Sequence, residues 1–207
     1  MHVYIIRHGE TDFNRNNIVQ GSGIDSDLND TGRAQALAFY EAYRHINFEL
    51  VVTSRLKRTH QTVDHFIQQN IPWHQTEDLN EISWGDLEGT PASEERHAAF
   101  NEIVGAWRAG QIDVAFPGGE SARQLEERLT RFLSWLRLRE EKNILVATHG
   151  RTLRALITQL KALPVSDMDR VGHVNTSCYL AHFTPQGVEF KLENDLNHLK
   201  LAGLLTP

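Results

Sequence analysis

Short apolar segments alternate along this chain with stretches whose apolar residues recur at helical spacing, and this alternation limits its fold more than any other feature. The strongest strand candidates are residues 2–7, 50–53, 144–148 and 178–183. Each ends at polar or glycine residues, and a helix-like stretch follows the first three. Strands that alternate with helices predict an α/β fold, a three-layer sandwich in which helices flank a mostly parallel central sheet.

Four helix starts are predicted from capping residues and from the apolar spacing that follows them. They lie at Asn29, Ser54, Ser121 and Gly150. At Ser121 the pattern is a capping box, because Gln124 follows three residues later and an amphipathic stretch comes after it. The helix that starts at Asn29 is expected to continue to about His45.

One segment interrupts the alternation of strands and helices. Residues 90–119 combine a helical pattern with a loop that contains glycine and proline, and we interpret them as an insertion or lid. A turn at residues 185–187 predicts a last hairpin strand over residues 188–193, whereas residues 194–207 carry little signal. Because 207 residues with 40% hydrophobic content can bury one core, we expect residues 1–207 to form a single domain.

Charge and composition argue against several kinds of partner. The formal net charge is -6 and the chain has no block of Lys/Arg, whereas nucleic-acid binding by counterion release needs a basic surface. No apolar run is long enough for a membrane span, and the N-terminus lacks the pattern of a signal peptide. Cys178 is the only cysteine, which rules out a disulfide framework. We therefore expect a cytoplasmic protein with no nucleic-acid or membrane partner.

Polar residues follow three of the predicted strands at the point where each strand ends. They are Arg7-His8-Gly9, Thr53-Ser54-Arg55 and Thr148-His149-Gly150. Because the carboxyl ends of strands in an open α/β sheet meet in one crevice, we expect these three segments to converge. Their residue types suit the binding of a phosphate group.

His8 is the candidate nucleophile of this site. A neutral imidazole keeps a lone pair on one nitrogen while its other nitrogen donates a hydrogen bond that fixes the ring. Arg7 offers a planar fork of donors that matches two phosphoryl oxygens. Arg58, together with Arg55 and Lys57, lies near a predicted helix start, where free backbone N–H groups favour an anion. A short basic run is more often a solvated face, and most of the 11 histidines must serve surface or packing roles.

Cleavage of a phosphomonoester also needs a group that protonates the departing oxygen, and a carboxylic acid is the natural supplier. The candidates are Glu10, Glu81, Asp86, Glu88 and Glu120. Glu81 is the first choice because apolar residues flank it in the sequence, and an apolar environment favours the protonated acid. No dinucleotide fingerprint, Walker-type motif or His-Glu-x-x-His pattern occurs, so no metal or cofactor site is predicted.

Together these motifs resemble those of the histidine phosphatase superfamily, also called the phosphoglycerate mutase-like family, through most of the chain. The matching segments are residues 7–11 with Asn14, 28–36, 54–62, 79–81 with 85–89, 117–121 and 146–150. Departures from the usual pattern are Phe13 for tryptophan, Asn29 for threonine, Arg55 for proline and Thr59 for alanine. The combination is far more specific than any one of these segments.

The resemblance implies a metal-independent phosphomonoesterase, without a cofactor, that acts on a small phosphorylated metabolite. Its catalytic residues would be His8, Glu81, Arg7, Arg58 and His149, and its substrate-binding residues Asn14, Gln20, Gly21 and Gly150. In the implied reaction, His8 attacks phosphorus while Glu81 protonates the leaving oxygen, and Glu81 then activates the water that hydrolyses phospho-His8. His149 would donate to phosphoryl oxygens, and the segment 90–119 would lie over the site.

Two alternatives to a phosphatase stay open. One is a cofactor-dependent phosphoglycerate mutase, although residues 82–89 resemble hydrolytic members and mutases usually carry longer closing elements. The other is a catalytically silent module that binds a phosphorylated ligand, which would have no need of Glu81. The sequence leaves open the identity of the substrate, whether Arg151 and Arg154 recognise a second acidic group, and whether the chain is a monomer or a dimer.

Overall fold

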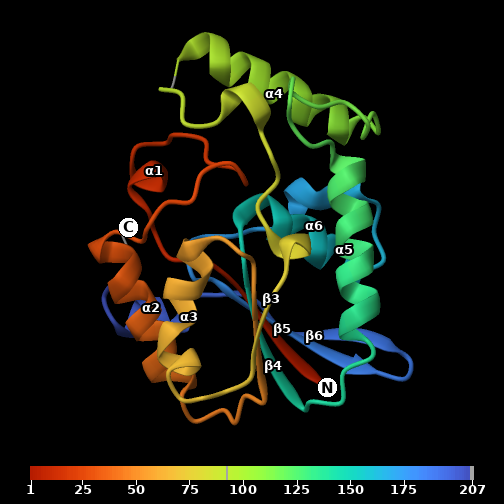
Figure 1. The fold of residues 1–207 in the computed structure, drawn as a ribbon. Helices are drawn as coiled ribbons and strands as arrows, with labels where there is room; N and C mark the ends of the chain where they lie inside the picture. Colours follow the sequence, from red (N-terminus) through yellow and green to blue (C-terminus); the bar gives the residue numbers. More distant parts are fainter. Residues whose placement is uncertain (92, 206–207) are drawn as a thin grey trace.

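A six-stranded sheet lies at the centre of the molecule in a computed structural model that describes residues 1–91 and 93–205 (Figure 1). The strands are β1 (His2–Arg7), β2 (Leu50–Thr53), β3 (Trp73–Gln75), β4 (Asn143–Thr148), β5 (Cys178–Thr184) and β6 (Gly187–Asp195). Their spatial order is β3-β2-β4-β1-β5-β6. The strands from β3 to β1 run parallel, whereas β5 and β6 are antiparallel to their neighbours. The predicted α/β fold with a mostly parallel sheet is confirmed.

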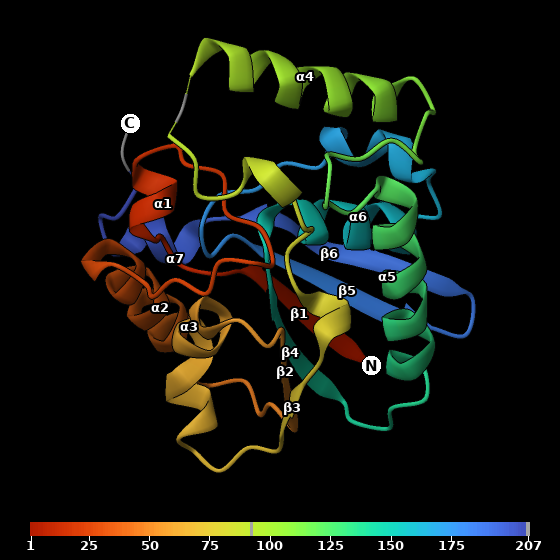
Figure 2. The same cartoon turned by 45° about the horizontal axis from the view of Figure 1, so that its top comes forward.

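Helices cover both faces of this sheet, with α2 and α3 on one face and α5 and α6 on the other (Figures 1 and 2). The helices are α1 (Asp12–Arg15), α2 (Asp30–Tyr43), α3 (Lys57–Ile67), α4 (Glu94–Arg108), α5 (Ala122–Leu136), α6 (Gly150–Leu160) and α7 (Asn197–Leu201). Short 3-10 turns occupy Glu77–Leu79, Gly85–Leu87 and Val165–Arg170. Within the described residues, no helix is long and apolar enough to cross a membrane.

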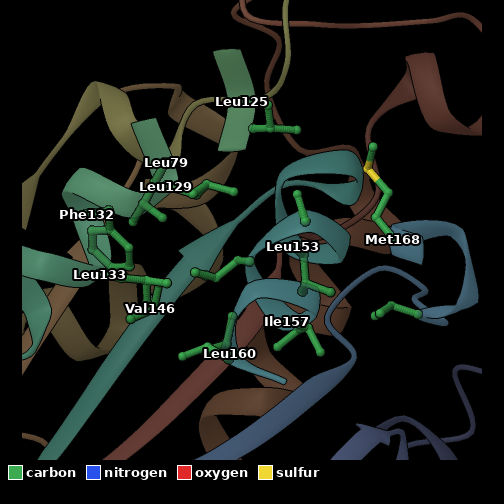
Figure 3. Packing of buried hydrophobic residues seen from close by; sticks show 14 of the residues in the cluster. Leu79, Leu125, Leu129, Phe132, Leu133, Val146, Leu153, Ile157, Leu160 and Met168 are labelled. Atoms are coloured by element: carbon green, nitrogen blue, oxygen red, sulfur yellow. The ribbon is translucent and has the colours of Figure 1, made fainter. Parts of the chain in front are cut away.

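The core is divided into two clusters because successive side chains of a strand point to opposite faces of a sheet. In β1, Val3 and Ile5 belong to the cluster under α5 and α6, whereas Tyr4 and Ile6 belong to the cluster under α2 and α3. Figure 3 shows the first cluster, in which leucines of α5 and α6 pack near Val146 of β4. Burial on both faces explains why the central strands read as continuous apolar runs.

Two of the predicted helix caps hold in detail. Asn29 accepts a hydrogen bond from the backbone N–H of Gly32 and caps α2, which ends at Tyr43, slightly before the predicted end. Ser121 and Gln124 form the full capping box at the start of α5, because each side chain bonds the backbone N–H of the other.

The predicted helix start at Ser54 is wrong, because α3 begins three residues later at Lys57. The Ser54 hydroxyl lies 2.9 Å from Oγ1 of Thr59 and 2.8 Å from Nε2 of His149, so it is engaged inside the molecule. The first backbone N–H of α3, from Lys57, instead donates to Oδ1 of Asp25 at 2.7 Å. A carboxylate from another segment has therefore taken over the capping role.

The segment 90–119 contains α4, which lies across the end of the molecule at which β1 ends (Figure 2). Residue 92, inside this predicted insertion, is outside the described residues. The helix is anchored by Trp107, which is buried and stacks on Trp84 with ring centroids 5.6 Å apart. Gly85 lies against the loop that follows α4, where a Cβ would meet the carbonyl oxygen of Pro117 at 2.1 Å.

Candidate active site

The carboxyl ends of β1, β2 and β4 lie side by side, because these strands are parallel and β4 pairs with both of the others. Arg7 pairs with Thr148 across β1 and β4. The next residues along each strand, His8 and His149, have ring centroids 5.2 Å apart. Arg58, in the first turn of α3, donates from Nε to Nδ1 of His149 at 3.1 Å. The structure therefore brings together the three polar segments that the sequence places at strand ends.

His8 is held in the form that a nucleophile requires. Its Nδ1 lies 2.7 Å from the carbonyl oxygen of Gly9. Because a carbonyl only accepts, Nδ1 carries the proton and Nε2 keeps its lone pair. Burial, and then the charges of Arg58 and Arg7, hold the pKa of His8 well below its ordinary value. The imidazole is therefore neutral at physiological pH.

Arg7 presents a donor that has no acceptor within the described part of the chain. Its Nε is buried and lacks a hydrogen-bond partner there, while its Nη1 lies 3.2 Å from Nδ1 of His173. Burial lowers the pKa of Arg7 to about 10, so the guanidinium stays charged at neutral pH. A buried N–H group without an acceptor is costly, and a bound phosphoryl oxygen would satisfy it.

Arg58 and His149 form a buried pair whose donors are directed mainly at the protein. Besides its bond to His149, Arg58 donates to the carbonyl oxygens of Ile24 at 2.6 Å and Gly21 at 3.2 Å. Because Nδ1 of His149 accepts from Arg58, its Nε2 carries the proton and donates to Ser54 at 2.8 Å. Both ring nitrogens are thus engaged within the protein, whereas the family resemblance implies that this histidine donates to phosphoryl oxygens.

Glu81 lines the same cavity as His8, and its carboxylate lies at the N-terminus of α6. Its Oε2 accepts from the backbone N–H of Arg151, and its Oε1 from those of Thr152 and Ile82, each at 3.0 Å. The expected apolar environment of the carboxyl group is therefore wrong. The side chain instead reaches the first turn of α6.

The other four acidic candidates are held away from His8. Glu10 accepts from the Asn29 amide, Glu88 from the backbone of Gly23 and Trp84, Glu120 pairs with Arg128, and Asp86 is exposed. Of the five candidates, Glu81 alone lines the cavity that contains His8. Among the described residues, no group of three or more His, Cys, Asp or Glu is arranged to hold a metal ion.

Two adjoining cavities open beside His8. The smaller has a volume of about 190 Å³ and contains His8 and Glu81 in its wall. The larger has a volume of about 430 Å³ and extends under α4. They share the wall residues Arg7, Asn14, Ile18, Val19 and Phe100. A ligand whose phosphate lies at His8 can therefore extend into the larger cavity.

The predicted substrate-binding residues differ in what they contact. Asn14, Gln20 and Gly150 line the smaller cavity. The Gln20 amide is already engaged by Thr11, to which its Nε2 donates at 2.7 Å. Gly21 lines neither cavity, since its carbonyl oxygen accepts from Arg58 instead. The contribution of Gly21 to the site is therefore indirect.

Two residues of the site, His173 and Asn175, do not follow from any sequence motif. The Asn175 amide donates to the carbonyl oxygen of His8 at 2.9 Å and to Oδ1 of Asn14 at 3.1 Å. His173 contacts Arg7, and burial lowers its pKa to about 2. Both precede β5, which is antiparallel to β1 and so begins where β1 ends. That antiparallel pairing is the signal that could have located them.

Arg151 and Arg154 are both paired with a carboxylate inside the protein. Both donate to Oδ1 of Asp169, Arg154 at 2.7 Å. The Arg151 guanidinium also lies 5.7 Å from the ring centroid of Trp84 and 5.9 Å from that of Phe100. The contacts of Arg151 link α6 to Trp84 and to Phe100 of α4, and both arginines link α6 to Asp169.

Known proteins with related sequences and structures include both mutases and phosphatases. The chain is 33% identical to the 2,3-bisphosphoglycerate-dependent phosphoglycerate mutase of Cytophaga hutchinsonii, in an alignment that covers 97% of this chain and 92% of that protein. The α-ribazole phosphatase of Shigella flexneri has a similar structure, with a TM-score of 0.82, 25% identity and coverage of 94% and 96% of the two chains. A mycobacterial glucosyl-3-phosphoglycerate phosphatase gives 0.82 and 25%, with coverage of 94% and 99%.

A family model described as the histidine phosphatase superfamily (branch 1) matches residues 3–196, nearly the whole chain. The match includes both strand ends that carry His8 and His149, the start of α3 with Arg58, and the segment with Glu81. This protein belongs to the histidine phosphatase superfamily.

Proposed function

We propose that this protein hydrolyses small phosphomonoesters through a phosphohistidine formed on His8. The observation that carries the proposal is the hydrogen bond between His8 Nδ1 and the Gly9 carbonyl, which leaves the lone pair on Nε2 of a neutral imidazole. The same cavity contains the carboxyl group of Glu81 and the guanidinium of Arg7. A nucleophile, a proton carrier and a positive charge therefore adjoin one space.

The reaction has two steps with balanced proton transfers. In the first, Nε2 of His8 attacks phosphorus, the bond from phosphorus to the ester oxygen breaks, and protonated Glu81 gives its proton to that oxygen. In the second, the Glu81 carboxylate removes a proton from water, whose oxygen attacks phosphorus and breaks the bond to Nε2. Phosphate leaves, and both His8 and Glu81 return to their starting forms.

Positive charge from two arginines supports this chemistry. Burial lowers the pKa values of Arg7 and Arg58 to about 10, so both remain cationic at neutral pH. The unpaired Nε of Arg7, in the wall of the same cavity, is a donor for a phosphoryl oxygen. Such preorganised charge stabilises the transition state of phosphoryl transfer more in a buried site than it would in water.

A phosphoglycerate mutase is the second candidate, and the 33% identity to the Cytophaga hutchinsonii mutase favours it. A mutase would form the same phosphohistidine on His8 but return the phosphoryl group to a second hydroxyl group instead of to water. Release of inorganic phosphate, measured beside the interconversion of 3- and 2-phosphoglycerate, separates the two. Isomerisation without release of phosphate would replace our proposal with the mutase.

The test of the phosphohistidine uses His8→Ala and the matched control His45→Ala, since His45 is exposed at the end of α2. We expect the wild-type protein and the control to release phosphate from 4-nitrophenyl phosphate, and His8→Ala to lose at least about 10³-fold in kcat. Rapid acid-free quenching followed by mass spectrometry should show phosphate on His8. Unchanged turnover in His8→Ala would contradict the proposal, and no turnover by the wild-type protein would favour a silent binding module.

A further inference from the structure

The larger cavity receives two basic side chains, Arg96 and His97, from the first turns of α4. These residues lie in the segment that the sequence predicts as an insertion over the site, and no motif singles them out. Because this cavity shares Arg7 and Asn14 with the cavity at His8, α4 contributes charge to the space that the leaving group of a phosphomonoester would occupy.

The larger cavity has an unbalanced charge. Its wall contains the guanidinium groups of Arg7 and Arg96 but no Asp or Glu, within the part of the chain that the structure describes. The remaining wall is formed by amide, apolar and small side chains, including Asn17 and Phe13. A cavity with two cations and no carboxylate has a positive potential that favours an anionic ligand.

One donor nitrogen of Arg96, Nη1, is buried without a hydrogen-bond acceptor in the described residues, 1–91 and 93–205. Buried guanidinium donors are normally paired, because an N–H group removed from water without an acceptor is costly. Nε of Arg7 and Nε of Arg154 are also buried without a partner in the described residues, but Arg154 is in addition bound to Asp169 through its Nη1.

We propose that Arg96 binds a second acidic group of the substrate, which makes this site selective for phosphomonoesters whose alcohol carries a carboxylate or a second phosphate. The inference rests on the proposed function, because it takes the group at His8 to be the phosphoryl group that is transferred. A planar guanidinium can donate two parallel hydrogen bonds to either kind of anion. Arg96 is then a specificity residue that contacts the leaving group.

Matched pairs of substrates test this selectivity in the full chain. The first pair is 4-carboxyphenyl phosphate and its neutral analogue 4-carbamoylphenyl phosphate, and the second is propane-1,3-diol bisphosphate and the monophosphate. We expect Arg96→Gln to lower kcat/KM for the charged member of at least one pair about tenfold or more, mainly through KM, and for the neutral members less than about twofold. The pair affected shows whether the anion is a carboxylate or a phosphate.

Two variants serve as controls for this experiment. Arg137→Gln removes an exposed arginine that follows α5, and it should leave every ratio unchanged. Arg96→Lys keeps the charge but not the fork, so it should retain part of the preference. Equal losses on charged and neutral substrates in Arg96→Gln, or no loss on either, would overturn the inference.

A binding measurement separates this inference from the proposed function. Calorimetry with 4-carboxybenzylphosphonate and 4-carbamoylbenzylphosphonate needs no turnover, since the bond from carbon to phosphorus is not hydrolysed. We expect the wild-type protein to bind the carboxylate compound about tenfold more tightly, and Arg96→Gln to abolish that difference. If the preference exists but no substrate releases phosphate, the phosphatase proposal fails and the anion site stands. If phosphate is released but neither preference depends on Arg96, the anion site fails alone.

Discussion

At the scale of single residues, two local hydrogen-bonding arrangements determine which chemistry the site can perform. The Gly9 carbonyl selects the tautomer of His8 in which Nε2 is free. The backbone N–H groups of Arg151 and Thr152 hold the Glu81 carboxylate in the wall of the same cavity. Because both arrangements use main-chain groups, the geometry of the site depends on the backbone fold more than on neighbouring side chains.

The substitution Glu81→Gln tests the proton-carrying role. Gln cannot give a proton to the leaving oxygen, and its NH₂ group would face backbone donors where the carboxylate now accepts. We expect kcat for alkyl phosphates to fall about 10²–10⁴-fold, with a smaller loss in phosphorylation of His8 by aryl phosphates, whose leaving oxygens need less protonation. In a plot of the logarithm of the phosphorylation rate constant against the pKa of the leaving alcohol, the slope should be steeper for the variant than for the wild-type protein.

Asp86→Asn is the control for this substitution, because Asp86 is exposed and lies in the same segment. Its plot should match that of the wild-type protein. If Glu81→Gln gave the same slope as the wild-type protein, another group would have to supply the proton.

The sequence was sufficient to nominate His8, Arg58 and His149, which lie in motifs at predicted strand or helix ends, and Glu81, which lies in a segment that resembles the family pattern. It could not place His173 and Asn175, whose positions depend on the antiparallel pairing of β5 with β1. It also could not show that the Glu81 carboxyl is turned toward α6, because its flanking apolar residues point elsewhere into the core. These features arise from contacts between segments that are distant in the chain.

At the scale of elements, the predicted helix caps that are confirmed are those whose hydrogen-bond partners lie close by in the sequence. Ser121 and Gln124 lie three residues apart, so their reciprocal bonds follow from the sequence alone. Ser54 has the residue type of a cap, but distant His149 binds its hydroxyl. Two short elements also depend on contacts with distant segments. The strand β3 is exposed and is defined by its pairing with β2, and the helix α7 packs against α2.

The substitution Ser121→Ala tests the capping box of α5. It removes the acceptor for the Gln124 backbone N–H, while α5 buries a row of leucines against the core. We expect the free energy of unfolding, from urea denaturation, to fall by about 1 kcal/mol. Ser134→Ala, at an exposed position within the same helix, should change it by less than about 0.5 kcal/mol. Equal effects of the two variants would show that the cap contributes nothing.

At the scale of the whole molecule, several buried histidines couple the fold to pH. The pKa values of His8, His149, His173 and His198 are all lowered, in each case mainly by burial. Below the ordinary histidine pKa of about 6.5, the unfolded chain therefore binds protons that the folded chain does not. The contribution of these four histidines to the free energy of unfolding is therefore fully present above that pH and is lost as the pH falls.

The substitution His198→Gln isolates one of these groups away from the active site. His198 is buried against Phe39, and its pKa is lowered to about 4. We expect the wild-type free energy of unfolding to decrease between pH 6.5 and 5, and the variant to decrease less steeply by about one proton, or about 1.4 kcal/mol per pH unit. Urea denaturation at several pH values measures this slope. The exposed His45→Gln variant should keep the wild-type slope, and an unaltered slope in His198→Gln would refute the assignment.

The position of β1 between β4 and β5 has a consequence for synthesis of the protein on the ribosome. β1 is made before its two neighbours, Asn143–Thr148 and Cys178–Thr184, which emerge much later. Until then the strand has no edge to pair with, and the loop that carries His173 does not exist. The nascent chain must therefore keep an apolar strand from aggregating through most of translation, and the surroundings of His8 are complete only late in synthesis.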